Sequence, residues 1–593
     1  MCGICGWFDT QGKPADLTAV ARMSARLERR GPDHVGSFAD GPVALGHRRL
    51  SILDLTYRGA QPMVDRERGL ALVFNGTIYN HPELRARLQG LGYRFASNGD
   101  TEVILNGYAH WGADVVNHLD GMFAFAIWDM REQKLMLARD RIGIKPLYYT
   151  DDTGPLRFAS TIPALLQGGG INTDLNPAAL HHQFTLHGVV PAPDTVLQGI
   201  KKLPPAHTLI IDAAGKKTCT RYWQIQTKVD DRIDQATAKE MVESALVEAV
   251  KKRMAISDVP VGVLLSGGLD SSLLVALASE NGFKPKSFTI GFEDQPEEKG
   301  NEFEYSDLVA ERYQTEHYRF HIPNDQVLSR LPEAVGEMSE PMFGQDAVAF
   351  YLLSEQVSRE VKVVLSGQGA DEVFAGYFWY PKMAEQFAQC GDEIQSFAPF
   401  YFDRSHEELM SMVTRRFRGP DVTSQRVKQG LGDSKDGPFT NRVLGFDIST
   451  LIVDDPVKRV DNMTMAWGLE ARVPFLDTKL VETAMRIPPE FKLDQGGKGV
   501  LKNLARSRIP DAVIDRPKGY FPVPALKFVR GPFLQFMREI LTGDSARARG
   551  LFEPAYVNRL LANPDQHFTR LVGAKVWHLA LFELWLQEHG ISA

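Results

Sequence analysis

The residue after the initiator methionine is a cysteine, and this position allows unusual chemistry. Because cysteine is small, we expect Met1 to be removed, which leaves the α-amine on Cys2 itself. That amine has a pKa near about 8 and can act as the base for its own thiol. Acyl chemistry also needs donors for a developing oxyanion. Asn75 and Gly76 follow the apolar run 70–74, where we expect a strand to end, and can offer a side-chain amide and an unhindered N–H.

Other interpretations of this cysteine stay open at this point. Cys2 and Cys5 can be small packed hydrophobes, as buried cysteines often are. Their C-x-x-C spacing also resembles half of a zinc site or a redox motif. No second pair of cysteines or histidines follows at finger spacing, which disfavours zinc. A redox motif would be expected between a strand and a helix rather than at the chain start.

A second group of chemically capable residues lies at 266–272, where the sequence reads Ser-Gly-Gly-Leu-Asp-Ser-Ser. A glycine-rich loop between a parallel strand and a helix presents N–H groups and a helix dipole to an anion. The serine hydroxyls add donors, and Asp270 suits Mg²⁺ better than phosphate. The loop lacks the lysine of a Walker A motif and the spacing of G-x-G-x-x-G. The pattern predicts phosphate binding, with a plain serine–glycine turn as the alternative.

A similar loop follows a later apolar run. After Leu365 the chain reads Ser-Gly-Gln-Gly-Ala-Asp-Glu over residues 366–372. Loops at the carboxyl ends of parallel strands can border a single crevice. We therefore expect Asp270 and Asp371 to be candidate ligands of the same magnesium ion. Asp371 and Glu372 also suit the start of a helix, which is the plainer interpretation of that pair.

The elements around the first group mix strands and helices. Strand-like runs are expected at 70–74, 122–128, 134–138, 147–150 and 156–159, and helices at 82–91 and 101–111. This mixture predicts layered α+β packing. The following polar segment predicts a connection between domains. We expect a first domain at 2–212, a linker at 213–236 and a second domain at 237–593.

In the second domain, strand and helix patterns alternate. A helix is expected at 236–253, then strands at 259–265, 286–292, 316–322 and 361–365, with helices at 271–280 and 352–359. This order predicts a parallel sheet with both faces covered. From about residue 377 onwards the pattern is mostly helical.

The composition narrows the function classes. The chain has 593 residues, a net charge of −7 and only four cysteines. The charge gives no basic surface for nucleic acid, and the sparse cysteines do not predict a disulfide framework. The N-terminus lacks the pattern of a signal peptide, and no run approaches about 18 apolar residues. Residues 571–586 are interrupted by charge and predict an amphipathic helix. We therefore expect a cytoplasmic protein without a membrane partner.

Taken together, the motifs resemble a known family. The N-terminal Met-Cys-Gly-Ile-Cys-Gly, the segments 30–33 and 47–52, Asn75-Gly76 and Asp100 resemble the glutaminase domain of class II amidotransferases. Residues 266–272 look like an ATP-pyrophosphatase loop. The segments 366–372, 470–477 and 516–518 complete the pattern of glutamine-hydrolysing asparagine synthetases. The resemblance spans nearly the whole chain and keeps the motif order.

The resemblance implies both a fold and a two-site reaction. The implied fold is an N-terminal α+β domain of the Ntn-hydrolase type, layered αββα, followed by an α/β parallel-sheet synthetase domain of the ATP-pyrophosphatase type with a helical C-terminal part. Cys2 would release ammonia from glutamine. ATP, with Mg²⁺, would adenylate an acceptor carboxylate, and ammonia passed through an internal tunnel would displace AMP.

The family's functional residues map onto this sequence residue by residue. The implied catalytic residues are Cys2, Asn75, Gly76 and Lys518, and the implied glutamine contacts are Arg49, Asn75, Gly76 and Asp100. The implied ATP contacts are Leu265, Ser266, Gly267, Gly268, Asp270, Ser271, Ile290, Ser366 and Gly367. Asp270 and Asp371 are the metal candidates, and Gln368 falls at the adenylate site. The arginine would grip the substrate α-carboxylate, and Asp100 suits its α-ammonium.

Two positions depart from the family pattern. The family usually has Asn-Gly-Glu where this chain has Asn75-Gly76-Thr77, so one carboxylate near the substrate ammonium is missing. The family usually has Ser-Gly-Glu-Gly where this chain has Gln368, and a neutral amide can neither act as a base nor hold a cation in the same way. Residues 339–351 and 366–381 resemble the N-acetylglutaminylglutamine amidotransferase branch. We therefore favour that capped dipeptide as acceptor over aspartate.

Two further alternatives remain. Thr77 and Gln368 allow a non-catalytic descendant that binds ATP or glutamine as a regulator, or an ammonia-only ligase with a decayed glutaminase half. Retention of Cys2, Asp270 and Lys518 argues against the first of these. A homodimer is expected from the resemblance alone.

Overall fold

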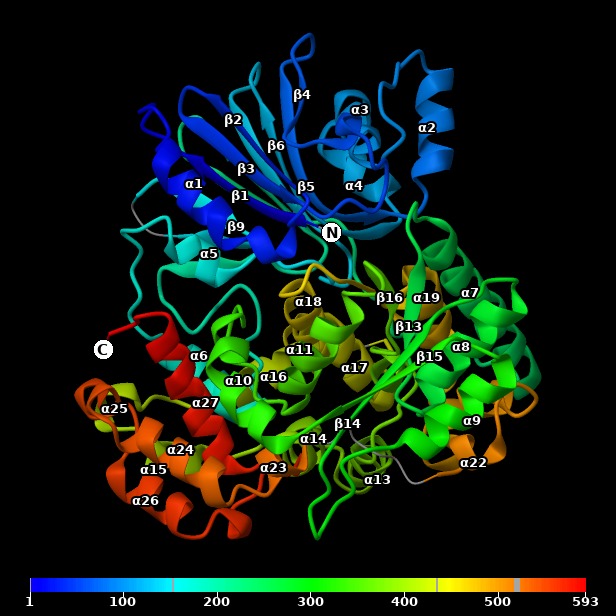
Figure 1. Ribbon diagram of the computed structural model, residues 1–593, viewed down its shortest axis with the longest axis vertical. Coiled ribbons are helices and arrows are strands. Elements are labelled where there is room, and N and C mark those ends of the chain that lie inside the picture. Colours follow the sequence, from blue (N-terminus) through cyan, green and yellow to red (C-terminus); the bar gives the residue numbers. More distant parts are fainter. Residues whose placement is uncertain (1, 152–153, 434–435, 517–522, 593) are drawn as a thin grey trace.

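The computed structural model describes residues 2–151, 154–433, 436–516 and 523–592. Figure 1 shows two halves, with the blue and cyan N-terminal half above the green to red C-terminal half. The chain crosses between them more than once. Helix α6 (Pro177–Thr185), although early in the sequence, contacts α15 (His406–Met412) and α16 (Val422–Gly432) of the second half. The two halves are therefore packed together through elements from both ends of the chain.

The N-terminal half contains two six-stranded sheets. The strands of the first sheet, in spatial order, are β10 (Ile200–Lys202), β8 (Tyr148–Thr150), β9 (Leu156–Ala159), β1 (Cys2–Phe8), β3 (Val43–Arg49) and β2 (His34–Asp40). Those of the second are β12 (Lys217–Arg221), β11 (His207–Asp212), β7 (Lys134–Arg139), β6 (Gly121–Asp129), β5 (Leu70–Ile78) and β4 (Met63–Asp65).

Apolar side chains fill the space between and outside these sheets. Ile4, Phe8 and Leu45 of the first sheet share one core with Val73 and Trp128 of the second. The outer face of the first sheet packs on α1 (Leu17–Arg26) and α5 (Ile162–Leu166). The outer face of the second packs on α2 (His81–Gly90), α3 (Thr101–Trp111) and α4 (Val115–His118). The result is two stacked sheets between two helical layers.

Two expectations for this half are corrected. The strand expected to end at 74 continues to Ile78, so Asn75 and Gly76 lie inside β5 and pair with β6 residues Ala124 and Phe123. The Asn-Gly pair, a common turn signal, is overridden here by sheet pairing. Residues 217–221, expected within the linker, form the fully exposed edge strand β12. Its polar sequence hid it, because exposed edge strands often carry Lys and Arg.

The C-terminal half is organised around one five-stranded sheet. Its spatial order is β15 (His317–Ile322), β14 (Ser287–Phe292), β13 (Val261–Leu264), β16 (Val363–Leu365) and β17 (Glu470–Arg472), and all pairs are parallel. All four strands expected from the sequence are confirmed, with shorter bounds. Strand β17 was not expected, because three residues are too few for a period-two pattern.

Helices flank the sheet and form the rest of this half. Near the sheet are α7 (Gln235–Ala255), α8 (Leu269–Glu280), α9 (Phe303–Tyr313), α10 (Asn324–Gly336), α11 (Asp346–Val357), α12 (Ala370–Val373), α18 (Lys458–Met465), α19 (Thr478–Arg486) and α21 (Gly499–Ala505). The other longer helices are α13 (Trp379–Cys390), α14 (Glu393–Tyr401), α17 (Phe439–Phe446), α24 (Gly531–Thr542), α25 (Asp544–Arg549), α26 (Pro554–Ala562) and α27 (Lys575–Glu588).

The segment 571–586 was expected to form an amphipathic helix, but its helix, α27, is buried on all sides. In α27 the run from Val576 to Leu586 is entirely buried, including His578 and Glu583. Glu583 is tolerated there because Arg549 pairs with it at 3.1 Å. Among the described residues, no helix is long and apolar enough to cross a membrane.

Candidate active site

Cys2 lies at the start of the central strand β1. It pairs across the sheet with Arg49 of β3, which brings the two side chains predicted to act together into neighbouring positions. Both are buried, with 7% of Cys2 and 6% of Arg49 exposed. The Cys2 N–H donates to Asn75 Oδ1 at 3.0 Å. This hydrogen bond joins the first residue of β1, in the first sheet, to β5 in the second sheet. The structure therefore brings Cys2 and Asn75 into direct contact.

Asn75 and Gly76 have the geometry that an oxyanion site needs. Asn75 is fully buried, and its Nδ2 has no hydrogen-bond partner among the described residues, although Asn75 itself does not line the small cavity that Cys2 and Gly76 border. A Cβ on Gly76 would lie 2.1 Å from the Met122 carbonyl oxygen, so no larger residue fits at this position. A preorganised amide donor beside a thiol suits stabilisation of a tetrahedral acyl intermediate.

A small cavity opens at the thiol, and we call it the thiol cavity. Cys2, Arg49, Gly76, Thr77 and Asp100 all line it, and its volume is about 30 Å³. The Arg49 guanidinium donates to the carbonyl oxygens of residues 53, 54 and 56, which fixes its direction. Asp100 Oδ2 accepts from the Ile78 N–H at 2.9 Å. The cavity thus holds a fixed guanidinium and a fixed carboxylate around one thiol.

The electrostatics show why this thiol needs a base. Burial raises the pKa of the Cys2 thiol, although the positive amino terminus and Arg49 act in the opposite direction. A thiol with a raised pKa stays protonated at neutral pH and is a poor nucleophile. An amine on the same residue can remove that proton within one side chain's reach.

The two glycine-containing loops border a second, much larger cavity, which we call the loop cavity. Strands β13 and β16 are parallel neighbours, and their following loops face the same space of about 480 Å³. The sequence-predicted residues that line it are Leu265, Ser266, Gly268, Asp270, Ser271, Ser366, Gly367, Gln368 and Asp371. Gly267 and Ile290 do not line it, and Lys518 lies outside the described residues.

The first loop is held in shape by its own serines. Ser271 Oγ accepts from the Ser266 N–H at 3.1 Å and lies 3.1 Å from Ser266 Oγ. Gly267 has a φ of 74°, and a Cβ there would meet the Ser306 nitrogen at 2.8 Å, so glycine is required. Helix α8 begins at Leu269, two residues earlier than expected, so Asp270 lies in its first turn.

Lys498, which sequence analysis missed, lies between the two candidate metal ligands. Its Nζ is 2.6 Å from Asp270 Oδ2 and 2.8 Å from Asp371 Oδ1. Two carboxylate oxygens converging on one point fit the oxygen-ligand preference of Mg²⁺, so the donor set suits that ion. For the metal to bind, the lysine ammonium would have to move away from the two carboxylates. A signal for this residue was present in the glycine-rich run 496–499 ahead of a helix.

The far end of the loop cavity is aromatic and acidic. Tyr377 and Trp379 stack there at 4.2 Å, and Tyr401 also lines the wall. The π-helical turns Asp447–Leu451 and Val453–Val457 supply further lining, and such turns are frequent at functional sites. Burial raises the pKa of Asp447 well above its ordinary value, although a hydrogen bond from the Tyr380 hydroxyl acts in the opposite direction.

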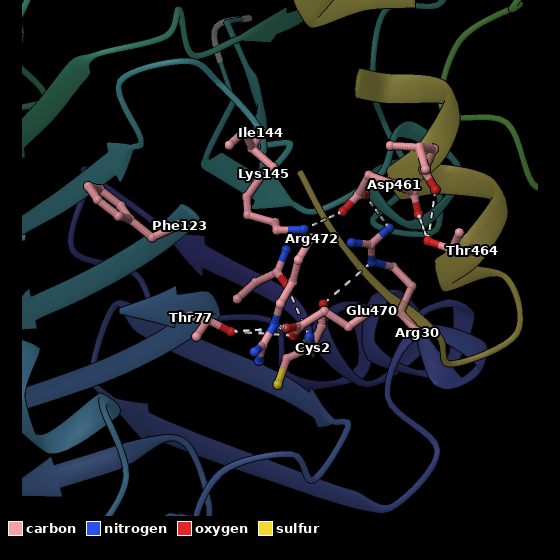
Figure 2. A network of polar contacts seen from close by, with 12 residues as sticks. Cys2, Arg30, Thr77, Phe123, Ile144, Lys145, Asp461, Thr464, Glu470 and Arg472 are labelled. Carbon is pink, nitrogen blue, oxygen red and sulfur yellow. Dashed lines mark hydrogen bonds and ion pairs between the residues drawn. The ribbon is translucent and has the colours of Figure 1, made fainter. Parts of the chain in front are cut away.

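A buried polar network joins the two halves beside Cys2 (Figure 2). Asp461 accepts from Lys145 at 3.0 Å and from Arg30 at 3.0 Å. Glu470, from strand β17, accepts from the Thr77 hydroxyl at 3.2 Å and also lines the thiol cavity. The thiol cavity is therefore completed by a residue of the C-terminal half, which sequence analysis missed.

Comparison with known proteins matches this two-site arrangement. A glutamine amidotransferase domain profile matches residues 1–223, and an asparagine synthase profile matches residues 241–587. The glutamine-hydrolysing asparagine synthetase 1 of Bacillus subtilis is 31% identical over 99% of this chain and 96% of its own length. Asparagine synthetase B of Escherichia coli is 30% identical over 88% of this chain and 82% of its own length.

These matches define a two-domain chain with an amidotransferase domain followed by a synthase domain. The chain belongs to the asparagine synthetase family, and it is a ligase of the asparagine synthase type.

Proposed function

We propose that this protein hydrolyses glutamine at Cys2 and transfers the ammonia to an acceptor carboxylate activated by ATP. The observation that carries this proposal is the buried Cys2, hydrogen-bonded to Asn75 and lining a cavity with Arg49 and Asp100, in the same chain as two loops that border one large cavity. The stacked-sheet half suits an Ntn-hydrolase-type glutaminase, and the parallel-sheet half suits an ATP-pyrophosphatase-type synthetase. Four cysteines without disulfides suit a reducing cytoplasm.

In the first half-reaction the Cys2 α-amine takes the thiol proton, and Sγ attacks the side-chain carbonyl carbon of glutamine. Asn75 Nδ2 is positioned to donate to the oxyanion. The amine returns the proton to the leaving nitrogen, so ammonia departs and a glutamyl thioester remains. Water then attacks the thioester and releases glutamate. Arg49 pairs with the substrate carboxylate and Asp100 with its ammonium.

In the second half-reaction an oxygen of the acceptor carboxylate attacks the α-phosphorus of ATP, and pyrophosphate leaves. Ammonia then attacks the acyl carbon and AMP leaves. The serines of the first loop and the N-terminus of α8 bind the phosphates. Asp270 and Asp371 would hold Mg²⁺, which would neutralise phosphate charge. Lys498 offers its ammonium to the departing pyrophosphate.

The pH dependence of the glutamine reaction should report Asp100. Burial raises the pKa of this carboxyl to about 6, so its negative charge is lost as pH falls through that value. Without that charge, the α-ammonium of glutamine loses the carboxylate of Asp100 as its partner. We expect kcat/KM for glutamine to fall about tenfold per pH unit below about pH 6, because kcat/KM reports the free enzyme. An Asp100→Asn variant should have low activity throughout and lack this limb, and a limb retained in that variant would assign it to another group.

The acceptor that the loop cavity suits best is N-acetylglutaminylglutamine. The cavity extends past the loops to the aromatic wall, which gives room for a capped dipeptide. At this end Arg459 is already paired with Asp346 at 3.0 Å and Asp455 at 2.5 Å, so its charge is already compensated and does not favour a second carboxylate. The Asp447 carboxyl also lines this end and can accept a hydrogen bond from an amide N–H. The names of the relatives favour aspartate as the alternative acceptor.

An acceptor screen separates the two. Pyrophosphate release is followed with ATP, glutamine and either N-acetylglutaminylglutamine or aspartate. We expect kcat/KM for the dipeptide to be about 100-fold higher than for aspartate. This is the effect expected when aspartate fails to make two polar contacts that the dipeptide makes. The Gln368→Glu variant should move this ratio towards aspartate. Turnover of aspartate above that of the dipeptide would replace the proposed acceptor, and no pyrophosphate release with any carboxylate would refute the synthetase itself.

A further inference from the structure

Position 77 is occupied by a residue that cannot do what the usual glutamate does. Thr77 lies in β5, only 1% exposed, and its hydroxyl cannot pair with a substrate ammonium as a carboxylate does. Its Oγ1 instead reaches across the boundary between the halves to Glu470, at 3.2 Å from Oε1 and 3.4 Å from Oε2 (Figure 2). Thr77 and Glu470 both line the thiol cavity, so the carboxylate of Glu470 borders it beside position 77.

Glu470 is held rigidly at this position. It begins strand β17, is fully buried, and accepts from the Arg472 Nε at 2.6 Å. Burial by itself raises the pKa of Glu470, but the positive amino terminus, Arg472 and Lys145 lower it to about 2. The side chain is therefore a carboxylate at every working pH.

Glu470 shares the thiol cavity with the other predicted glutamine contacts. Cys2, Arg49 and Asp100 line this cavity together with Glu470. The negative charge of Glu470 is one of the causes that raise the pKa of Asp100, so the two carboxylates lie near enough to repel each other. Two carboxylates that repel across one cavity are a natural site for a cation.

We propose that Glu470 supplies the carboxylate that Thr77 lacks, and that it binds the α-ammonium of glutamine together with Asp100. The proposal rests on the glutamine hydrolysis proposed above. It makes glutamine recognition depend on the C-terminal half. Strand β17 also carries the Arg472 carbonyl that accepts from the Ser366 N–H at 2.8 Å, so the same strand touches both cavities.

The test compares two amides that differ only in the ammonium. Glutamine and glutaramate (5-amino-5-oxopentanoate) share the carboxylate and the amide, but glutaramate has no α-ammonium. Release of ammonia from each is measured with wild-type protein and with Glu470→Gln. We expect Glu470→Gln to raise the KM for glutamine by about 10- to 100-fold, as for loss of one charged hydrogen bond. The KM for glutaramate should change less than about threefold.

A second variant keeps the test informative if Glu470→Gln weakens folding. Thr77→Glu combined with Glu470→Gln returns the carboxylate to β5 and should restore most of the glutamine affinity. The matched control is Glu482→Gln, which removes the charge of a glutamate that accepts from Trp223 at 2.9 Å on the surface. It should leave both KM values unchanged.

The outcomes separate the two proposals. An equal rise in KM for both amides, or no rise for glutamine, would overturn the role of Glu470 and leave glutamine hydrolysis at Cys2 standing. A wild-type protein that releases no ammonia from either amide would refute the hydrolysis, and the role of Glu470 with it.

Discussion

Replacing Cys2 with alanine should abolish glutamine-dependent synthesis and preserve ammonia-dependent synthesis. Among the described residues that line the thiol cavity, the Cys2 thiol is the one group that can both attack an amide and be deprotonated by an amine on its own residue. Removal of a nucleophile costs orders of magnitude in rate, and we expect a loss of about 10³-fold or more in glutamate release. Added ammonium salt bypasses this site. Because the loop cavity is separate from the thiol cavity, product formation with ammonia should stay within about twofold of wild type.

The chain provides a matched control for this variant. Cys5 lies in the same strand, is fully buried and has its pKa raised to about 12 by burial, so its thiol is inert. Cys5→Ala should keep glutamine-dependent activity. Mass spectrometry of the purified protein checks that Met1 has been removed. Loss of both activities in a folded Cys2→Ala protein would contradict the two-site arrangement, and retained glutaminase activity would contradict Cys2 as nucleophile.

The sequence predicted the local parts of the thiol cavity and missed the distant one. Cys2, Arg49 and Asp100 belong to motifs a few residues long, so their types alone indicated chemistry. Their assembly rests on the pairing of Cys2 with Arg49, in a register that places alternate residues of the fully buried β1 in the two cores on either side of its sheet. Glu470 is 393 residues away from Thr77, and only the packing of the two halves brings them together. No periodicity or motif reports a contact of that kind.

In the second half, strands β13, β14 and β16 were predictable because they are buried and read as largely apolar runs. The edge strand β15 is partly exposed, and its alternating aromatic and apolar residues indicated it instead. Strand β17 was not predictable because it has only three residues. Strand β12, in the segment expected to be the linker, was not predictable because it is entirely exposed and polar. The shared cavity of the two loops followed from strand adjacency. Its aromatic end did not, because Trp379 and Tyr401 come from helices α13 and α14 and Tyr377 from the loop before α13, and the placement of all three depends on tertiary packing.

Replacing Lys498 with methionine should reduce both glutamine-dependent and ammonia-dependent synthesis. The ammonium holds the carboxylates of Asp270 and Asp371 together, and burial of two unpaired carboxylates is costly. It also pairs with one aspartate beside each loop, where charge develops as pyrophosphate leaves. Loss of one such donor typically costs about 10²- to 10³-fold in rate. We expect pyrophosphate release to fall by that factor with either nitrogen source.

The distinction from Cys2→Ala lies in the pattern of loss, because Lys498→Met should spare glutamate release while it stops pyrophosphate release. Lys498→Arg tests whether charge alone suffices. A planar guanidinium cannot place one nitrogen between two carboxylates as an ammonium does, so we expect only partial recovery.

Lys479→Met, which removes a surface lysine paired with Glu248, is the matched control and should leave both rates unchanged. Thermal unfolding checks that the variants remain folded, since breaking a buried ion pair costs about 3–5 kcal/mol. Pyrophosphate release at the wild-type rate in folded Lys498→Met would remove the lysine from the mechanism and leave the two aspartates as an ion-binding pair.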